Sequence, residues 1–203
     1  MNGLFPQGDA VFSSDQVYRY WLTRDLTAGL LVKPDILSTC AFVMLNPSTA
    51  DANFDDPTIR KCKKLARLWG HTRLVIVNLF AYRATDPKNM WNAWRVGSSG
   101  IVGDDNDHHI TKAVQDARSM PPYLIQNSDE IRVVVRHPGR VVAAWGRGGT
   151  HNKEALRFFR YRCEAVCKLI GTELTCLKEN SDGTPVHPLY QPDDSEPMRW
   201  RGM

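Results

Sequence analysis

The sequence has 203 residues, of which 42% are hydrophobic and 24% are charged. This composition is typical of a globular protein rather than a disordered or fibrous one, and the length allows one sizeable core, so we expect a single α/β domain over residues 1–203. The formal net charge of +4 is compatible with a polyanionic partner such as DNA, but many proteins of this charge bind none.

Two further features bear on location. No apolar run approaches the length that spans a bilayer, and the start MNGLFPQGDAVF lacks the basic end and long apolar stretch of a signal peptide. Five cysteines, an odd number, favour buried thiols in a reducing compartment over a disulfide framework. We therefore expect a cytoplasmic protein without a membrane partner, with residues 1–16 and 195–203 as loosely held ends.

The first half of the chain predicts a strand, a strand and a helix. Residues 17–23 alternate in polarity, which is typical of an antiparallel strand, whereas residues 41–45 are continuously apolar and predict a strand covered on both faces. Residues 58–69 place apolar side chains at helical spacing. Asp55 or Asp56 can cap this helix, Pro57 suits its first turn and Gly70 ends it.

The same alternation continues to the end of the chain. We expect strands over residues 73–78, 140–145 and 173–177, and helices over residues 105–117 and 151–170. Because parallel neighbours need crossover helices, this order predicts a three-layer α/β/α fold with a central four-stranded parallel sheet. Residues 87–103 and 119–139 are excursions, and residues 131–136 in the second predict an added antiparallel edge strand or hairpin arm.

Polar segments follow each buried strand. They are residues 46–51, 78–87, 145–150 and 187–190. In an open parallel sheet, ligands bind outside the carboxyl ends of the strands, so the topology predicts one cleft lined by these segments.

Each segment also has a plainer interpretation. Asn46 and Pro47 suit any strand exit, and the glycine-rich residues 146–149 suit a turn before a helix as well as a phosphate site, although they lack the spacing of a nucleotide fingerprint. His187 fits a surface position. The residues 104–109, DDNDHH, resemble a metal cluster but fit better as the polar start of a helix, so we expect neither a metal nor a cofactor.

The ordered set of motifs resembles an uncharacterised bacterial and phage family known only as a domain of unknown function. The resemblance covers nearly the whole chain and includes the Asn-Pro-Ser-Thr-Ala-Asp motif. Its motifs are LTR at residues 22–24, FVMLNPSTAD at 42–51, DDPTIR at 55–60, VNLFA at 77–81, RATDP at 83–87, GDDND at 103–107, AWG at 144–146 and HPLY at 187–190.

At longer range, the motif order resembles the uracil-DNA glycosylase superfamily, whose members have a four-stranded parallel sheet between helices. Residues 45–47, LNP, resemble the Ile-Asn-Pro signature of the mismatch-specific branch, which implies that Asn46 positions the attacking water. Asn78 resembles the strand-end Asn that reads the flipped base. His187 and Pro188 resemble the His-Pro loop that stabilises the leaving base and touches DNA. Ser48 departs from this pattern, because that branch usually has Gly there.

The chemistry of N-glycosidic hydrolysis assigns further roles. Asp51 is the stronger candidate if a true proton acceptor is required, and Asn78 offers a donor and an acceptor to a pyrimidine edge. Phe80 or Tyr82 could stack on an extruded base, although Tyr82 suits the core equally. The candidate nucleic-acid or phosphate contacts are Ser48, Gly146, Arg147, Gly148 and Pro188, with Lys61 and Lys64 either phosphate contacts or a solvated helix face.

Three functions remain open from the sequence. The first is a glycosylase-type hydrolase that acts on a damaged, mismatched or hypermodified base in DNA. The second is a non-catalytic DNA or modified-base binding module, which the Ser48 departure favours. The third is an enzyme that acts on free nucleotides or nucleosides, with Arg147 and the glycine turn holding a phosphate.

Overall fold

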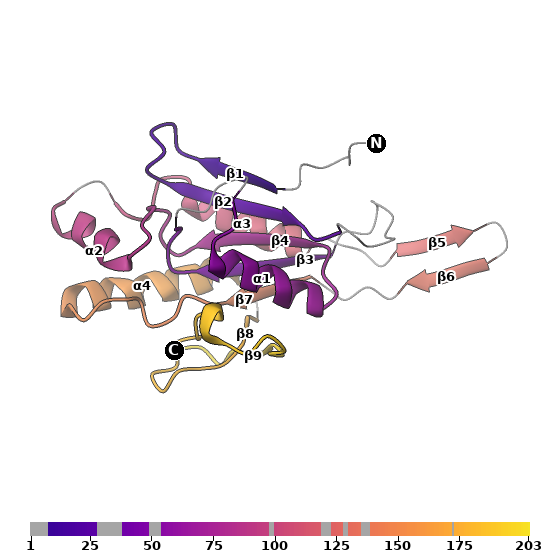
Figure 1. Cartoon of the computed structure of the whole chain (residues 1–203). Coiled ribbons are helices and arrows are strands. Elements are labelled where there is room, and N and C mark those ends of the chain that lie inside the picture. The colour runs from indigo at the N-terminus through magenta and orange to yellow at the C-terminus, as the bar shows by residue number, and fades with distance from the viewer. Residues whose placement is uncertain are drawn as a thin grey trace.

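The computed structural model describes residues 8–27, 38–48, 54–97, 100–118, 123–127, 130–134, 139–171 and 173–203 (Figure 1). The helices are α1 (Pro57–Leu68), α2 (Pro87–Arg95), α3 (Asn106–Arg118), α4 (Lys153–Ile170) and the 3-10 helix η1 (Pro188–Tyr190). The strands are β1 (Gly8–Phe12), β2 (Arg19–Asp25), β3 (Thr39–Met44), β4 (Arg73–Asn78), β5 (Tyr123–Asn127), β6 (Glu130–Val134), β7 (Arg140–Ala143), β8 (Thr175–Cys176) and β9 (Met198–Arg199).

The main sheet has the strand order β1-β2-β4-β3-β7-β8-β9 in the described part of the chain. The pairs β4/β3, β3/β7 and β7/β8 are parallel, whereas β1 and β2 at one edge and β9 at the other are antiparallel to their neighbours. The predicted α/β class is therefore confirmed, in a mixed and mostly parallel sheet. This sheet is wider than the expected four strands, because antiparallel strands extend both of its edges.

The excursion at residues 119–139 contains β5 and β6, which pair with each other and with no other described strand. The hairpin arm predicted at residues 131–136 is therefore β6, whereas the antiparallel edges of the main sheet are formed by β1 and β2 on one side and by β9 on the other. The other excursion, at residues 87–103, includes α2. Its helix starts after Asp86, whose carboxylate accepts a hydrogen bond from the backbone N–H of Lys88 at 2.9 Å.

Helices cover both faces of the sheet, as the alternation of side chains on β3 shows. Ala41 and Val43 belong to a core cluster with residues of α2, α3 and α4. Cys40 and Phe42, which point the other way, pack with residues of α1. Figure 1 shows α1 in front of the sheet and α3 behind it. The continuously apolar sequence of β3 is thus explained by burial on both faces.

The capped helix predicted at residues 58–69 is confirmed as α1. Asp56 caps its start by accepting a hydrogen bond from the backbone N–H of Ile59 at 2.8 Å, and Pro57 follows the cap. The buried face includes Cys62 and Leu65, and Gly70 adopts a φ of 79° just after the helix. The start of α1 lies beside the segment that follows β3, because the hydroxyl of Ser48 donates a hydrogen bond to Asp56.

Described residues near both ends of the chain pair in the main sheet. Strand β1 extends the sheet beside β2, and β9 pairs with β8. Trp200 is buried, and its indole N–H donates to the carbonyl of Gly183 at 3.0 Å. Strand pairing by β9 and burial of Trp200 hold the C-terminal segment against the sheet, although its sequence has no periodic pattern.

All five cysteines are free thiols. Burial raises the pKa of Cys167 and of Cys176 to about 11, so both thiols are protonated at neutral pH. Protonated thiols pack as small apolar side chains, which agrees with the buried thiols that we expected from the sequence. Within the described ranges, no helix has the length and apolar character that a membrane crossing requires.

Gly139 lies where α3 approaches the beginning of β3, and we expect Gly139→Ala to destabilise the fold strongly. A Cβ atom there would lie 1.7 Å from the carbonyl oxygen of Ala117 and 2.9 Å from that of Thr39. Both neighbours are backbone, so relief requires moving α3 from the sheet, at a cost of about 2–3 kcal/mol. Denaturant unfolding measures this loss. The control is Gly100→Ala, whose Cβ would have nothing within 4 Å; equal stability of the two variants would contradict the packing seen at Gly139.

Candidate functional site

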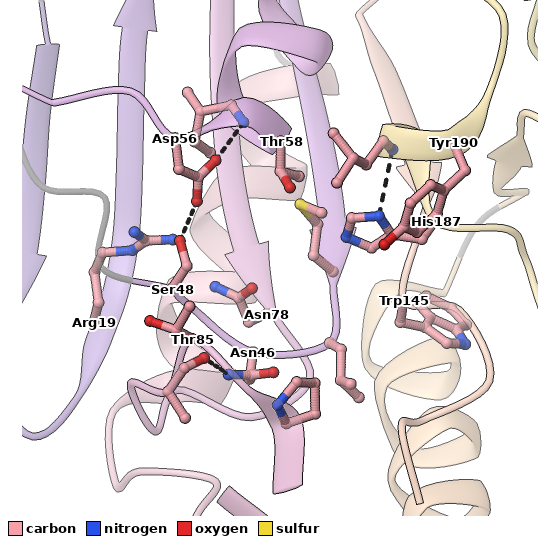
Figure 2. A pocket seen from close by; sticks show the side chains of 16 residues that line it. Arg19, Asn46, Ser48, Asp56, Thr58, Asn78, Thr85, Trp145, His187 and Tyr190 are labelled. Atoms are coloured by element: carbon pink, nitrogen blue, oxygen red, sulfur yellow. Dashed lines mark hydrogen bonds between the residues drawn. The ribbon is translucent and has the colours of Figure 1, made fainter. Parts of the chain in front are cut away.

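A cavity of about 320 Å³, here called the inner cavity, lies at the carboxyl ends of the parallel strands on the α1 face (Figure 2). Residues that follow β3, β4 and β7 form its walls, together with the start of α1 and residues around η1. The lining residues that carry polar groups are Arg19, Asn46, Ser48, Asp56, Thr58, Asn78, Thr85, Trp145, His187 and Tyr190.

Strand register brings the two asparagines into this cavity. Met44 on β3 pairs with Asn78 on β4, so the two strands end at the same level. The pairing continues beyond them, because the N–H of Leu79 donates to the carbonyl of Met44 at 2.8 Å, and the N–H of Ala84 donates to the carbonyl of Pro47 at 2.9 Å. The segments that carry Asn46 and Asn78 therefore leave the sheet side by side.

The amide of Asn46 is fixed by its neighbours. Its Nδ2 donates to the carbonyl of Ala84 at 2.7 Å and to that of Pro47 at 3.1 Å. Since both amide hydrogens are used by backbone oxygens, Oδ1 is the group that Asn46 presents to a ligand. It is an acceptor held in one orientation, as positioning a water molecule requires.

Asn78 is 1% exposed, and its Nδ2 has no hydrogen-bond partner among the residues that the structure describes. The strand end that carries it is held from the other face, where Asn106 donates to the carbonyl of Asn78 at 3.0 Å and Arg162 donates to that of Leu79 at 2.7 Å. A buried amide donor without a protein partner is costly, so an ordered water molecule or a bound ligand has to supply its hydrogen-bond acceptor. Its position on the cavity wall makes it a candidate ligand contact.

His187 presents a hydrogen-bond donor to the same cavity. Its Nδ1 accepts from the backbone N–H of Leu189 at 3.3 Å, so the proton of the neutral ring lies on Nε2. Figure 2 shows this second nitrogen directed toward the interior of the cavity. Burial lowers the pKa of His187, and the negative charge of Asp56 only partly opposes this shift, so the ring is neutral at neutral pH.

This lowered pKa makes stability depend on pH. The unfolded chain binds a proton on His187 at higher pH than the folded chain, so stability is fully present above about pH 6.5 and falls as the pH decreases below it. Denaturant unfolding between about pH 7 and pH 5 should therefore show a smaller acid loss in His187→Gln than in the original protein. His109, whose pKa burial also lowers, contributes a similar loss to both proteins and cancels in the comparison. The exposed His151, changed to Gln, is the control, and an identical acid loss in all three proteins would contradict the assignment.

Three polar residues extend the site beyond the two asparagines and His187. The hydroxyl of Ser48 donates to Oδ2 of Asp56, which ties the segment after β3 to the cap of α1. Arg19 is 2% exposed, and Figure 2 shows its guanidinium on the cavity wall beside Ser48. Sequence reasoning recognised Asp56 only as a cap and missed Arg19. An arginine directly before the aromatic and apolar residues Tyr20, Trp21 and Leu22 was the available signal.

The predicted stacking residues do not line the inner cavity. Phe80 is fully buried on the opposite face, with its ring centroid 5.3 Å from that of Trp91. Tyr82 packs edge-on against Tyr18, at 6.2 Å between ring centroids. The aromatic side chains at the cavity are instead Trp145, which follows β7, and the exposed Tyr190.

The predicted phosphate turn also lies outside the cavity lining. Arg147 forms an ion pair with Asp182 at 3.7 Å and is a surface group. Gly148 has a φ of 81°, and an added Cβ would lie 2.8 Å from the ring of Phe159, so this glycine serves packing. Gly146 is near the site, because a Cβ there would lie 3.8 Å from the Cβ of His187.

Two other expected residues have different positions. Pro188 is buried and begins η1, next to His187. Asp51, the candidate proton acceptor, lies outside the described residues. Lys61 and Lys64 both form ion pairs with Asp193, so their charges are partly neutralised within the protein.

The acidic and histidine-rich residues 104–109 mark the start of α3. Asn106 at that start is fully buried and donates to the carbonyl oxygens of Asn78 and Leu79. Across the described ranges, no group of three or more His, Cys, Asp or Glu side chains is placed to hold a metal ion. The helix-start interpretation of this segment therefore agrees with its position.

Comparison with known proteins gives a family but no activity. The model of the family described as "Protein of unknown function (DUF1643)" matches residues 19–189. No curated protein and no solved structure matches the chain. The matched range includes every described residue of the inner cavity except Tyr190. The chain belongs to the DUF1643 family.

Proposed function

We propose that this protein hydrolyses the N-glycosidic bond of a damaged, mismatched or hypermodified base in DNA. The observation that carries the proposal is the set of polar groups facing the inner cavity. Asn46 offers an oriented acceptor, Asn78 offers a buried donor without a partner, and His187 offers a donor from a neutral ring. The acceptor of Asn46 can orient a water molecule, and the donor of Asn78 can bind the edge of a base. The donor of His187 can stabilise the departing base.

The reaction exchanges one bond for another. The water oxygen bonds to C1′ of the sugar as the bond from C1′ to the base nitrogen breaks, and the bonding electrons leave with the base. One proton of the water stays on the new sugar hydroxyl, and the other ends on the released base. The oxygen of Asn46 can orient the water, while Nε2–H of His187 stabilises the negative charge that develops on the base.

The size and walls of the cavity suit a single base. Its volume of about 320 Å³ lies at the lower end of ligand pockets, which span roughly 300–1,000 Å³. Trp145 lines the cavity, and Tyr190, which is 82% exposed, stands at its rim. An extruded base is usually held between aromatic or apolar side chains, so the exposed Tyr190 replaces Phe80 and Tyr82 as the stacking candidate. Trp145, by contrast, is 1% exposed and packs edge-on against Trp200.

The resemblance to uracil-DNA glycosylases gives additional support. That superfamily has a four-stranded parallel sheet between helices, and here the parallel pairs β4/β3, β3/β7 and β7/β8 lie between α1 and the opposite helices. Asn46, Asn78 and His187 occupy the carboxyl end of this sheet. Fold alone does not imply a reaction, so the proposal depends on the polar groups rather than on the sheet.

The decisive experiment measures abasic sites in DNA. Duplexes with uracil, mismatched thymine, 5-hydroxymethyluracil or hypermodified bases are incubated with the protein and then treated with alkali, which cleaves abasic sites. Cleavage that requires the protein supports glycosylase activity. Tight binding of a modified duplex without cleavage would support a binding module instead. Failure to bind any DNA, together with thermal stabilisation by a free nucleotide, would support an enzyme of nucleotide metabolism.

A further inference from the structure

A second hollow of about 510 Å³, here called the outer groove, adjoins the inner cavity. The two share Ser48, Ala84 and Thr85 as walls. The remaining lining of the outer groove is formed by Gln16, Val17, Tyr82, Arg83 and Asn89. A ligand whose base enters the inner cavity can therefore continue past these shared residues into the groove.

Arg83 supplies the positive charge of the outer groove. Its Nη1 donates to the carbonyl of Gln16 at 3.0 Å, and its guanidinium carbon lies 4.8 Å from the ring centroid of Phe12. These contacts hold the side chain without neutralising it. Its Nε is buried and has no partner among the described residues, where Arg83 also forms no ion pair with a carboxylate.

Three other arginines differ from Arg83, because each forms an ion pair with a carboxylate. Arg24 pairs with Asp55, Arg162 with Asp107, and Arg147 with Asp182. In the β1–β2 turn, the carboxylate of Asp15 accepts hydrogen bonds from the hydroxyl of Ser13 at 2.6 Å and the N–H of Val17 at 3.1 Å. The acid nearest to Gln16 in sequence is thus engaged within its own turn.

We propose that the outer groove binds the phosphate group attached to the nucleoside whose base enters the inner cavity, and that Arg83 contacts this phosphate. This inference rests on the proposed function, because it assumes a base in the inner cavity. A guanidinium forms paired, charge-assisted hydrogen bonds with phosphate oxygens, and a preorganised one loses little entropy in doing so. The exposed amide of Asn89 provides a further polar group on the same wall.

Calorimetric titration with matched ligands tests the inference. The probes are the nucleosides deoxyuridine, thymidine, 5-hydroxymethyldeoxyuridine and deoxyguanosine, their 5′-monophosphates, and short single-stranded oligonucleotides that contain each once. Arg83→Gln is expected to weaken binding of the phosphate-bearing probes by about 10- to 100-fold, as the loss of a charge-assisted contact implies. Binding of the nucleosides should stay unchanged, because they have no phosphate.

Two further variants provide controls. Arg95→Gln removes the same charge from an exposed position on α2 outside both hollows, so it should leave all affinities within about twofold. Arg147→Gln tests the glycine turn as the alternative phosphate site. Weakening by Arg147→Gln but not by Arg83→Gln would overturn the assignment, and so would equal weakening by Arg83→Gln and Arg95→Gln.

Asn78→Ala separates failure of this inference from failure of the proposed function. If Asn78→Ala abolishes nucleoside binding while Arg83→Gln changes no affinity, only the outer-groove inference fails. If no probe binds, the outer-groove inference fails, whereas the proposed function is decided separately by the cleavage of modified duplexes. Where Arg83→Gln does weaken binding, the source of the phosphate follows from the original protein: preference for oligonucleotides identifies a polynucleotide, and equal or tighter binding of the monophosphates identifies a free nucleotide.

Discussion

Asn46→Ala is expected to lower the rate of abasic-site formation by about 10²- to 10³-fold, the usual effect of removing one preorganised polar group at a reacting centre. Asn46 is held by the carbonyls of Ala84 and Pro47, so its Oδ1 can orient water without reorganisation. The measurement is single-turnover cleavage of the best duplex substrate. Because the group acts mainly on water, the affinity for uncleaved DNA should stay within the same order of magnitude.

The control for this prediction must separate catalysis from folding. Loss of the hydrogen bond from Asn46 to Ala84 costs about 1 kcal/mol of stability by itself, so thermal unfolding is measured in parallel. Asn92→Ala makes the same change at an exposed position of α2 and should leave the rate unaltered. A fully active Asn46→Ala protein would remove Asn46 from the mechanism.

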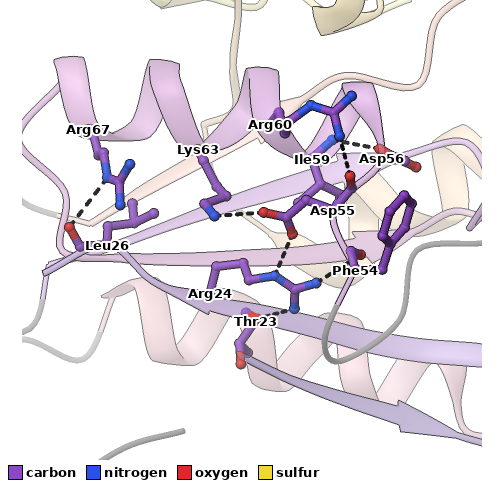
Figure 3. A network of polar contacts seen from close by, with 10 residues as sticks. All are labelled: Thr23, Arg24, Leu26, Phe54, Asp55, Asp56, Ile59, Arg60, Lys63 and Arg67. Carbon is purple, nitrogen blue, oxygen red and sulfur yellow. Dashed lines mark hydrogen bonds and ion pairs between the residues drawn. The ribbon is translucent and has the colours of Figure 1, made fainter. Parts of the chain in front are cut away.

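Asp55→Ala is expected to lower the free energy of unfolding by about 3 kcal/mol, because it leaves a buried arginine without its carboxylate. Figure 3 shows the network: Asp55 accepts from Nε of Arg24 at 2.7 Å and from Nζ of Lys63 at 2.6 Å. The side chain of Arg24 is 5% exposed, and its Nη1 also donates to the carbonyl of Thr23 at 2.7 Å. Chemical denaturation measures the loss.

Asp193→Ala is the matched control, because Asp193 also joins two cations, Lys61 and Lys64, from an exposed position. The side chain of Asp193 is 57% exposed, so its loss should lower the free energy of unfolding much less than the loss of Asp55 does. If Asp55→Ala and Asp193→Ala lowered the free energy of unfolding equally, burial would not be the reason that the Asp55 network stabilises the fold. The Asp55 network also supports the site, since Asp55 directly precedes Asp56, which lines the inner cavity.

The Asp55 network has a pH signature as well. Burial alone would raise the pKa of Asp55, but hydrogen bonds and charge from Lys63 and Arg24 outweigh burial and lower it below 3.8. Since the folded pKa lies below the unfolded value, this stabilisation is present above about pH 4 and is lost as the pH falls through the folded pKa. The free energy of unfolding of the original protein should therefore exceed that of Asp55→Ala by a constant amount above about pH 4. This difference should decrease as the pH falls below that value.

Local sequence signals predicted the regular elements well where caps and periodicity agree. The helix expected at residues 58–69 is α1 (Pro57–Leu68), and the strand expected at residues 73–78 is β4 (Arg73–Asn78). Predictions were less accurate where pairing decides the limits. The strand expected at residues 173–177 is only Thr175–Cys176, because β8 is set by short ladders with β7 and β9.

Four predicted site residues line the inner cavity: Asn46, Ser48, Asn78 and His187. They could be predicted because parallel strands place their carboxyl ends at one edge. Phe80 and Arg147 could not be placed in this way, since no local pattern tells which face a residue beyond a strand end will occupy. Phe80 is buried in the core, and Arg147 forms an ion pair with Asp182 at the surface.

The sequence by itself determined the α/β class, the capped helix α1 and the polar strand ends that carry Asn46 and Asn78, because periodicity, capping and chain order are local properties. Only the tertiary structure decided that Arg19 of β2 and Asp56, the cap of α1, join them, and that Arg83 lines an adjoining groove. Such contacts join residues far apart in the chain, and they exist only when strand register and helix packing place those residues together.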